Sequence, residues 1–130
     1  MAKRISSPSV GLCLDLGHAH IVAGLRRTDP LELIEPALDR AVLFHLHDNL
    51  GARRGGSGSP SPELDPLRLD LHLPPGRGNV PWSRFAPLLA RKSVAAMVLE
   101  VHPPRPAAAH LFEAAIETVA PPAVPALAQL

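Results

Sequence analysis

The sequence predicts an α/β protein built from about three βα units that share a parallel sheet. Three short apolar runs each end in acidic or histidine residues, and a helix-like stretch follows each run further along the chain. This alternation is typical of parallel sheets, because parallel strands need a crossover connection between them. A length of 130 residues suits one domain of ordinary size.

The first predicted unit starts with an apolar strand over residues 10–14, which ends at the segment Asp15-Leu-Gly-His18. Its helix is predicted over residues 30–40, after an intervening loop. Apolar side chains recur there at helical spacing; they are Leu31, Ile34 and Leu38.

The second unit has a predicted strand over residues 41–44, which ends at the polar segment His45-Leu-His-Asp-Asn49. About thirty residues separate this strand from its helix, and loops of that length are usually functional or mobile. The loop begins with a Gly/Ser/Pro-rich tip over 51–62 and continues into a segment over 70–78 that is expected to be ordered. The helix is predicted over 81–91, with a buried stripe made of Trp82, Phe85 and Leu89.

The third unit has a predicted strand over residues 94–99, which ends at Glu100-Val-His102. An apolar face at helical spacing predicts a helix over 107–119. One partial domain is therefore expected over 1–120, and a frayed tail over 121–130.

Charge and cysteine content narrow the function classes. Thirteen basic residues nearly balance twelve acidic ones, giving a net charge of +1, so nothing draws the chain as a whole toward nucleic acid or an anionic membrane. The single Cys13 excludes an intrachain disulfide and is expected to be a buried neutral thiol. No apolar segment of signal-peptide or membrane-spanning length precedes Asp15, which favours a soluble, cytoplasmic protein.

All three predicted strands end in carboxylate or imidazole side chains, at the sheet edge where parallel α/β proteins bind ligands. Oxygen and imidazole ligands without thiolates suit zinc, manganese, cobalt or magnesium. The candidate residues on this rim are Asp15, His18, His45, Asp70, His72 and Glu100. Weaker candidates are His20, His47, Asp48 and Asn49; we expect His47 to orient a ligand, and His20 and His110 to be structural or surface residues.

Four motifs in this order resemble those of the xylose-isomerase-like barrels, which include sugar-phosphate isomerases and epimerases and the class II apurinic endonucleases. Asp15-Leu-Gly-His18 resembles the D-x-x-H motif after the sixth strand, and His45-Leu-His-Asp48 resembles the H-x-x-D motif after the seventh. Asp70-Leu-His72, followed by Gly76-Arg-Gly78, resembles the D-x-H…G-x-G segment of the same loop after the seventh strand. Glu100 resembles the glutamate on the eighth strand.

The resemblance implies that the chain is the C-terminal portion, strands 6 to 8, of a (β/α)8 TIM barrel. A complete barrel needs about 250 residues, and the family's first five strands and its strand-five glutamate are absent. The implied metal ligands are Asp15, His45 and Glu100, with Asp70 and His72 able to hold an additional ion. A partner chain or self-association could supply the missing strands.

The activity implied by the resemblance is that of a metal-dependent sugar or sugar-phosphate isomerase or epimerase, with proton transfer through an enediolate. Glu100 would be one of an acid and base pair whose other member lies outside this chain. His18 and His47 would contact substrate, and Arg77 could pair with a phosphate.

Two other interpretations stay open. The first is a class II apurinic endonuclease-like phosphodiesterase, favoured by the spacing of Asp70 and His72 but opposed by the balanced charge and the scarcity of aromatic residues. The second is a non-catalytic, truncated remnant, whose uncovered sheet edge would invite association. Nucleic acid is thus the less favoured partner.

Overall fold

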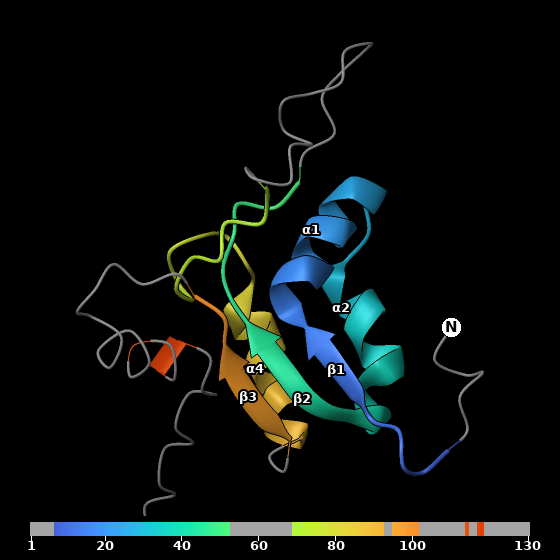
Figure 1. The fold of residues 1–130 in the computed structure, drawn as a ribbon. Coiled ribbons are helices and arrows are strands. Elements are labelled where there is room, and N and C mark those ends of the chain that lie inside the picture. Colours follow the sequence, from blue (N-terminus) through green and yellow to red (C-terminus); the bar gives the residue numbers. More distant parts are fainter. Residues whose placement is uncertain (1–6, 53–68, 93–94, 102–113, 115–116, 119–130) are drawn as a thin grey trace, which may run out of the picture.

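The computed structural model of the chain describes residues 7–52, 69–92, 95–101, 114 and 117–118. The order of its elements follows the chain (Figure 1). They are β1 (Leu12–Asp15), α1 (Leu16–Arg26), α2 (Pro30–Ile34), the 3-10 helix η2 (Glu35–Arg40), β2 (Ala41–Leu46), α4 (Trp82–Arg91) and β3 (Ala96–Leu99).

The three strands form one parallel sheet in the order β1-β2-β3, which confirms the predicted α/β class. Asp15 pairs in register with His45, and His45 pairs with Val98. Because the strands run in the same direction, their carboxyl ends meet at one edge of the sheet. The side chains that end the strands are therefore brought together there.

The core lies on one face of the sheet, where Figure 1 places α4 behind the strands, with α1 and α2 beside β1. Phe44 at the centre of β2 and Phe85 of α4 are both fully buried. The predicted helix stripe is confirmed, because Trp82, Phe85 and Leu89 all belong to the buried core cluster. Burial of such side chains stabilises the packing of α4 on the sheet by about 1.5–3 kcal/mol each.

The first βα unit differs from the prediction in two places. The first helix was predicted to begin at residue 30, but α1 starts directly after β1, with Asp15 as its N-cap accepting a hydrogen bond from the His18 amide at 2.8 Å. The single helix expected over 30–40 is instead α2 followed by η2. Pro36 explains the break, since proline removes a backbone donor and crowds the preceding turn.

The expectation for Cys13 was wrong, because this thiol is exposed. Cys13 pairs in register with Leu43 of β2, and Leu43 pairs with Ala96 of β3. These residues lie on the sheet face opposite Phe44, and in the described part of the chain Ala96 is exposed as well. Burial of the thiol had been inferred from its apolar neighbours in sequence, which alternate between the two faces.

Several expectations lie wholly or mainly outside the described residues: the loop tip over 51–62, the helix over 107–119 and the tail over 121–130. Within the predicted helix, residues 114, 117 and 118 are described and are helical. No helix in the described part of the chain has the length and apolar character needed to cross a membrane.

Candidate metal centre at the strand ends

One group of polar side chains lies where the three strands end. Asp15 closes β1, His45 is the next-to-last residue of β2, and Glu100 directly follows β3. His45 Nδ1 lies 3.2 Å from Glu100 Oε2 and 3.8 Å from Asp15 Oδ2. Three strands far apart in sequence therefore contribute one residue each to a single cluster.

Asp15 connects this cluster to its neighbours. Its Oδ2 lies 2.9 Å from His18 Nδ1, and its Oδ1 lies 3.1 Å from His47 Nε2. Burial opposes ionisation of the Asp15 carboxyl, but the hydrogen bonds from His47 and from the His18 amide, with both imidazoles close by, lower its pKa below the usual value. Asp15 is thus an ionised carboxylate at neutral pH, the form that binds cations.

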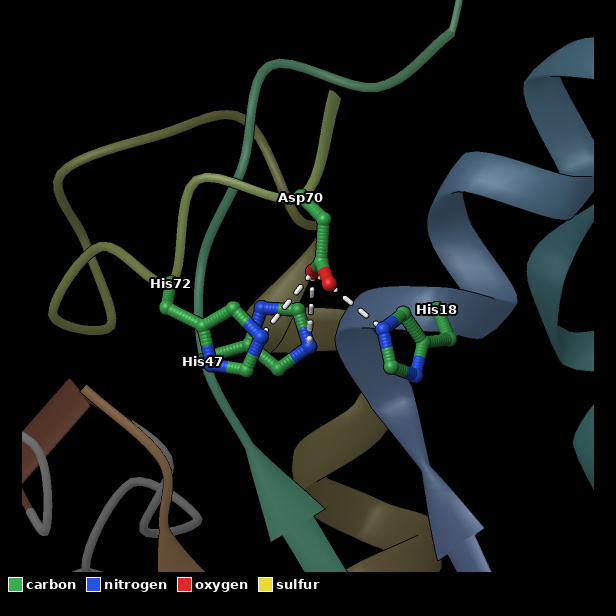
Figure 2. A group of neighbouring side chains, drawn as sticks. All are labelled: His18, His47, Asp70 and His72. Atoms are coloured by element: carbon green, nitrogen blue, oxygen red, sulfur yellow. Dashed lines mark ion pairs between the residues drawn. The ribbon is translucent and has the colours of Figure 1, made fainter. Parts of the chain in front are cut away.

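A second group surrounds the carboxyl of Asp70, where three imidazoles converge (Figure 2). Asp70 Oδ1 lies 3.1 Å from His72 Nε2, 3.2 Å from His18 Nε2 and 3.9 Å from His47 Nε2. Each of the four residues offers one potential ligand atom, and these atoms all lie within 4.8 Å of one another. Such an arrangement of one carboxylate and three imidazoles matches the ligand preferences of zinc and similar divalent cations.

The orientation of His72 is set by the chain itself. Its Nδ1–H donates to the carbonyl oxygen of Glu100 at 2.8 Å, so Nε2 is directed at Asp70. Metal-binding histidines are commonly oriented in this way by a bond from the other ring nitrogen. His72 also has a φ of 46°, in the left-handed region, and its ring converges with the Asp70 carboxyl. Non-glycine residues in this region are uncommon and cluster at functional sites.

The electrostatics of this second group are coupled. Burial opposes the charge on Asp70, but its contacts with His18 and His72 lower its pKa overall. Burial likewise opposes protonation of His72, but its bond to Glu100 and the nearby Asp70 carboxylate raise its pKa overall. A proton on His72 would therefore compete with a cation for Nε2.

His47 occupies the centre of both groups and is fully buried. Its ring stacks on His72 with centroids 4.2 Å apart and planes at 9°. Its Nε2 faces Asp15, and within the described residues its Nδ1 has no hydrogen-bond partner. Buried polar atoms are normally paired, so this nitrogen supports a site for a further ligand. A potential metal-binding group also joins His47 to Asp15 and Glu100.

His47 is predicted to orient a ligand or to contact substrate, and the structure buries it more deeply than His45. Asp48 and Asn49 were ranked as weak candidates, yet both are fully buried. Their position directly after a buried strand is the sequence feature from which their burial could have been predicted. His20 hydrogen-bonds Asn79 at 2.8 Å, which agrees with the structural role expected for it.

Arg77 is exposed, and in the described part of the chain its side chain makes no polar contact with the cluster. Its amide donates to the carbonyl of Pro74 at 3.0 Å, within a turn. His102, His110 and the Arg53-Arg54 pair lie outside the described residues.

Comparison with known proteins agrees with this arrangement. Residues 1–119 match the family described as xylose isomerase-like TIM barrel. The chain belongs to this family, and its parallel three-stranded α/β sheet is consistent with part of such a barrel.

Among curated proteins, the chain is similar to the uncharacterized protein y4fM of Sinorhizobium fredii (strain NBRC 101917 / NGR234), with 30% identity over 88 residues. The match covers 68% of this chain and 22% of the relative, so the chain spans less than a quarter of that protein's length. No solved structure gives a significant match.

Proposed function

We propose that this chain supplies strands 6 to 8 of a TIM barrel that acts as a metal-dependent sugar or sugar-phosphate isomerase or epimerase. The observation that carries the proposal is the meeting of Asp15, His45 and Glu100 at the carboxyl ends of three parallel strands. Barrel enzymes of this kind place their catalytic residues at that end. Family membership supports the proposal at the level of the fold. At the level of the metal it is supported by a group of potential ligand atoms that joins Asp15 and Glu100 to His47, beside His45.

The three residues at the strand ends would hold a divalent cation: zinc, manganese, cobalt or magnesium. Such a cation, when bound, acts as a Lewis acid that polarises a carbonyl and stabilises the charge developing on its oxygen. Asp70 and His72, with His18 and His47 beside them, could hold an additional ion.

The proton transfer falls to the chain's own carboxylate. Glu100 has a side chain that is 35% exposed and lies 3.2 Å from His45, so it is both accessible to a substrate and anchored. A carboxylate in that position can take a proton from the carbon beside the carbonyl and return it. The second acid or base of the pair would come from outside this chain.

His18 and Arg77 are the proposed substrate contacts at the mouth of the site. The His18 side chain is 49% exposed, so a substrate can reach it, but both its nitrogens lie within 3.2 Å of carboxylates and one would have to exchange its partner for a substrate hydroxyl. Arg77 is exposed on the loop and would pair with the phosphate of a sugar phosphate, for which the planar guanidinium is suited. A cytoplasmic location fits substrates of this class.

The substitution Glu100→Gln tests the proposal in the assembled barrel. It removes the carboxylate that accepts the proton while keeping the shape of the side chain, so turnover of a panel of ketoses and ketose phosphates should fall by roughly 10²–10⁴-fold. Metal content should fall too, while the far-ultraviolet circular dichroism spectrum stays the same. Unchanged metal content together with unchanged turnover would contradict the assignment of Glu100.

A second candidate function is a phosphodiesterase related to the class II apurinic endonucleases. It is favoured by the convergence of His18, Asp70 and His72, which could hold an additional ion. The balanced charge of the chain counts against a polyanionic substrate. Two or three ions per site, lost in Asp70→Ala, together with cleavage of abasic DNA, would favour this candidate. Turnover of ketoses or ketose phosphates without cleavage of abasic DNA favours the sugar enzyme, whether or not an additional ion is bound near Asp70.

A further inference from the structure

Asp48 follows β2 by two residues and is fully buried, although it carries a carboxyl group. A buried carboxyl is costly to keep in a fold unless hydrogen bonds replace the water that it has lost. Neither the metal chemistry nor the proton transfer proposed above uses this residue. Its contacts therefore need a separate explanation.

The Asp48 carboxyl accepts four hydrogen bonds, two on each oxygen. Oδ1 accepts from the amides of Asn49 at 2.8 Å and Val80 at 3.0 Å. Oδ2 accepts from the amide of Gly76 at 2.8 Å and from the indole Nε1–H of Trp82 at 2.9 Å. An ionised carboxylate has about four lone-pair sites, so this network fills them all.

Two of these four donors belong to the segment that returns from the long loop to α4, and a third, Trp82, is the first residue of α4. The backbone of Asp48 adds to them, because its amide donates to Leu73 O at 2.6 Å and its carbonyl accepts from Leu73 N at 2.9 Å. Leu73 directly follows His72, and Asp70 lies three residues before Leu73. The end of β2 therefore holds the loop at the position next to its two candidate ligands.

Gly78 lies so close to Asp48 that no side chain fits between them. A Cβ atom there would lie 2.3 Å from Asp48 Oδ1 and 2.2 Å from the carbonyl oxygen of Asn49. The loop backbone thus approaches the carboxyl as closely as glycine permits.

We propose that Asp48 is a positioning residue that fixes the 70–80 segment over the strand ends, and so places Asp70 and His72 in reach of His18. The expected effect on metal binding rests on the proposed function. The expected effect on the position of the 70–80 segment does not. The mechanism predicts a selective effect: losing the network should release the group around Asp70 and leave Asp15, His45 and Glu100 in place on their strands.

Asp48→Asn is the direct test, since it preserves shape but replaces one acceptor oxygen with a donor. Whichever way the asparagine amide is oriented, its NH2 group faces two N–H donors, and these two donors lose their acceptor. In the metal-free 130-residue chain, hydrogen exchange should accelerate by at least about tenfold at the Val80 amide if the new NH2 group replaces Oδ1, or at the Gly76 amide if it replaces Oδ2, since an unsatisfied pair costs about 1.4 kcal/mol or more. Amides within β2 and α4 should keep their protection.

The effect of Asp48→Asn on metal binding is measured with zinc alone, by equilibrium dialysis. The zinc binding that depends on Asp70 should be at least tenfold weaker. The zinc binding that depends on Glu100 should be retained. Gly78→Ala, which leaves Asp48 itself intact, should give the same selective loss. Asp29→Asn is the matched control, because it removes a charged contact between α2 and α4 and touches neither loop nor cluster.

Uniform loss of protection in Asp48→Asn, with both kinds of zinc binding falling together, would overturn the proposal and leave Asp48 a general stability residue. Unchanged exchange at Gly76 and Val80 would overturn it as well. If the unsubstituted chain binds no zinc, the metal function fails, whereas the exchange measurement still decides whether Asp48 positions the loop.

Discussion

Gly17 lies directly against the ring of His47 and leaves no space for a methyl group. A Cβ atom at position 17 would lie 2.3 Å from His47 Cε1 and 2.4 Å from Nε2. The glycine in the Asp15-Leu-Gly-His18 segment therefore allows a buried imidazole to lie beneath the start of α1. Gly17, which lies between two candidate ligands in the sequence, thus shapes the site itself.

Substituting Gly17→Ala should displace His47 and weaken zinc binding by at least tenfold, because the ring belongs to both potential metal-binding groups. Alanine favours the helix by about 1 kcal/mol, so a loss of zinc binding would come from the clash and not from helix propensity. Isothermal titration of zinc into the 130-residue chain measures the effect.

Gly24→Ala provides the control for this experiment. It lies in the same helix and also clashes, since its Cβ would lie 2.2 Å from the carbonyl oxygen of Ala52. It should alter stability without weakening zinc binding. Equal zinc affinities for Gly17→Ala and the unsubstituted chain would contradict the role given to Gly17.

At the residue scale, the sequence located Asp15, His18, His45 and Glu100, because polar side chains that end apolar runs are visible in the sequence itself. The central, fully buried position of His47 could not be predicted from the sequence. The burial of that ring depends on Gly17, thirty positions earlier, and on His72, on the far side of a long loop. Nor could the sequence foresee that Asp48 would bond to Gly76, Val80 and Trp82.

At the scale of elements, the parallel strands and the buried stripe of α4 were predictable. Short apolar runs bounded by polar residues indicate the strands, and apolar residues three to four positions apart indicate the stripe. Helix α1 was missed because Asp15-Leu-Gly-His18 was interpreted only as ligands. The same aspartate is an N-cap that starts a helix. One side chain thus serves both the fold and the candidate metal centre.

Asp29 links two elements: its carboxyl caps α2 through the Leu31 amide and pairs with Arg84 of α4. The hydrogen bond from the Arg84 guanidinium, followed by the one from Leu31, lowers the pKa of Asp29 below its usual value. A lowered folded-state pKa contributes stability that is present above the unfolded-state pKa, about 3.9. That contribution is lost as the pH falls through the folded-state value.

Asp29→Asn should therefore reduce the urea midpoint at pH 7, and this difference should shrink as the pH falls below about 4. Asparagine caps helices about as well as aspartate does, so the comparison isolates the charge. Urea unfolding at a series of pH values measures it. A difference that stays constant from pH 7 to pH 3 would show that the charge of Asp29 is not responsible.

At the scale of the whole molecule, the sheet has one covered face and one open face in the described part of the chain. The open face carries Cys13 of β1, Leu43 of β2, and Ala96 and Val98 of β3; all but the half-buried Leu43 are exposed. Family membership assigns such a face to the interior of a barrel. The numbering of these strands as 6 to 8 stays a proposal, because it depends on strands that this sequence does not contain.

We predict that the purified 130-residue chain associates with itself, since parallel sheets are normally covered on both faces and unpaired edges attract further strands. Sedimentation velocity at micromolar concentration, with a reductant to keep Cys13 as a thiol, should show species larger than the monomer. Ala96→Lys places a charge on the open face and should shift the distribution toward monomer. Leu50→Lys is the matched control, because Leu50 is 57% exposed but lies outside the sheet. A compact monomer for the unsubstituted chain, or equal effects of the two lysine substitutions, would show that the open face does not drive association.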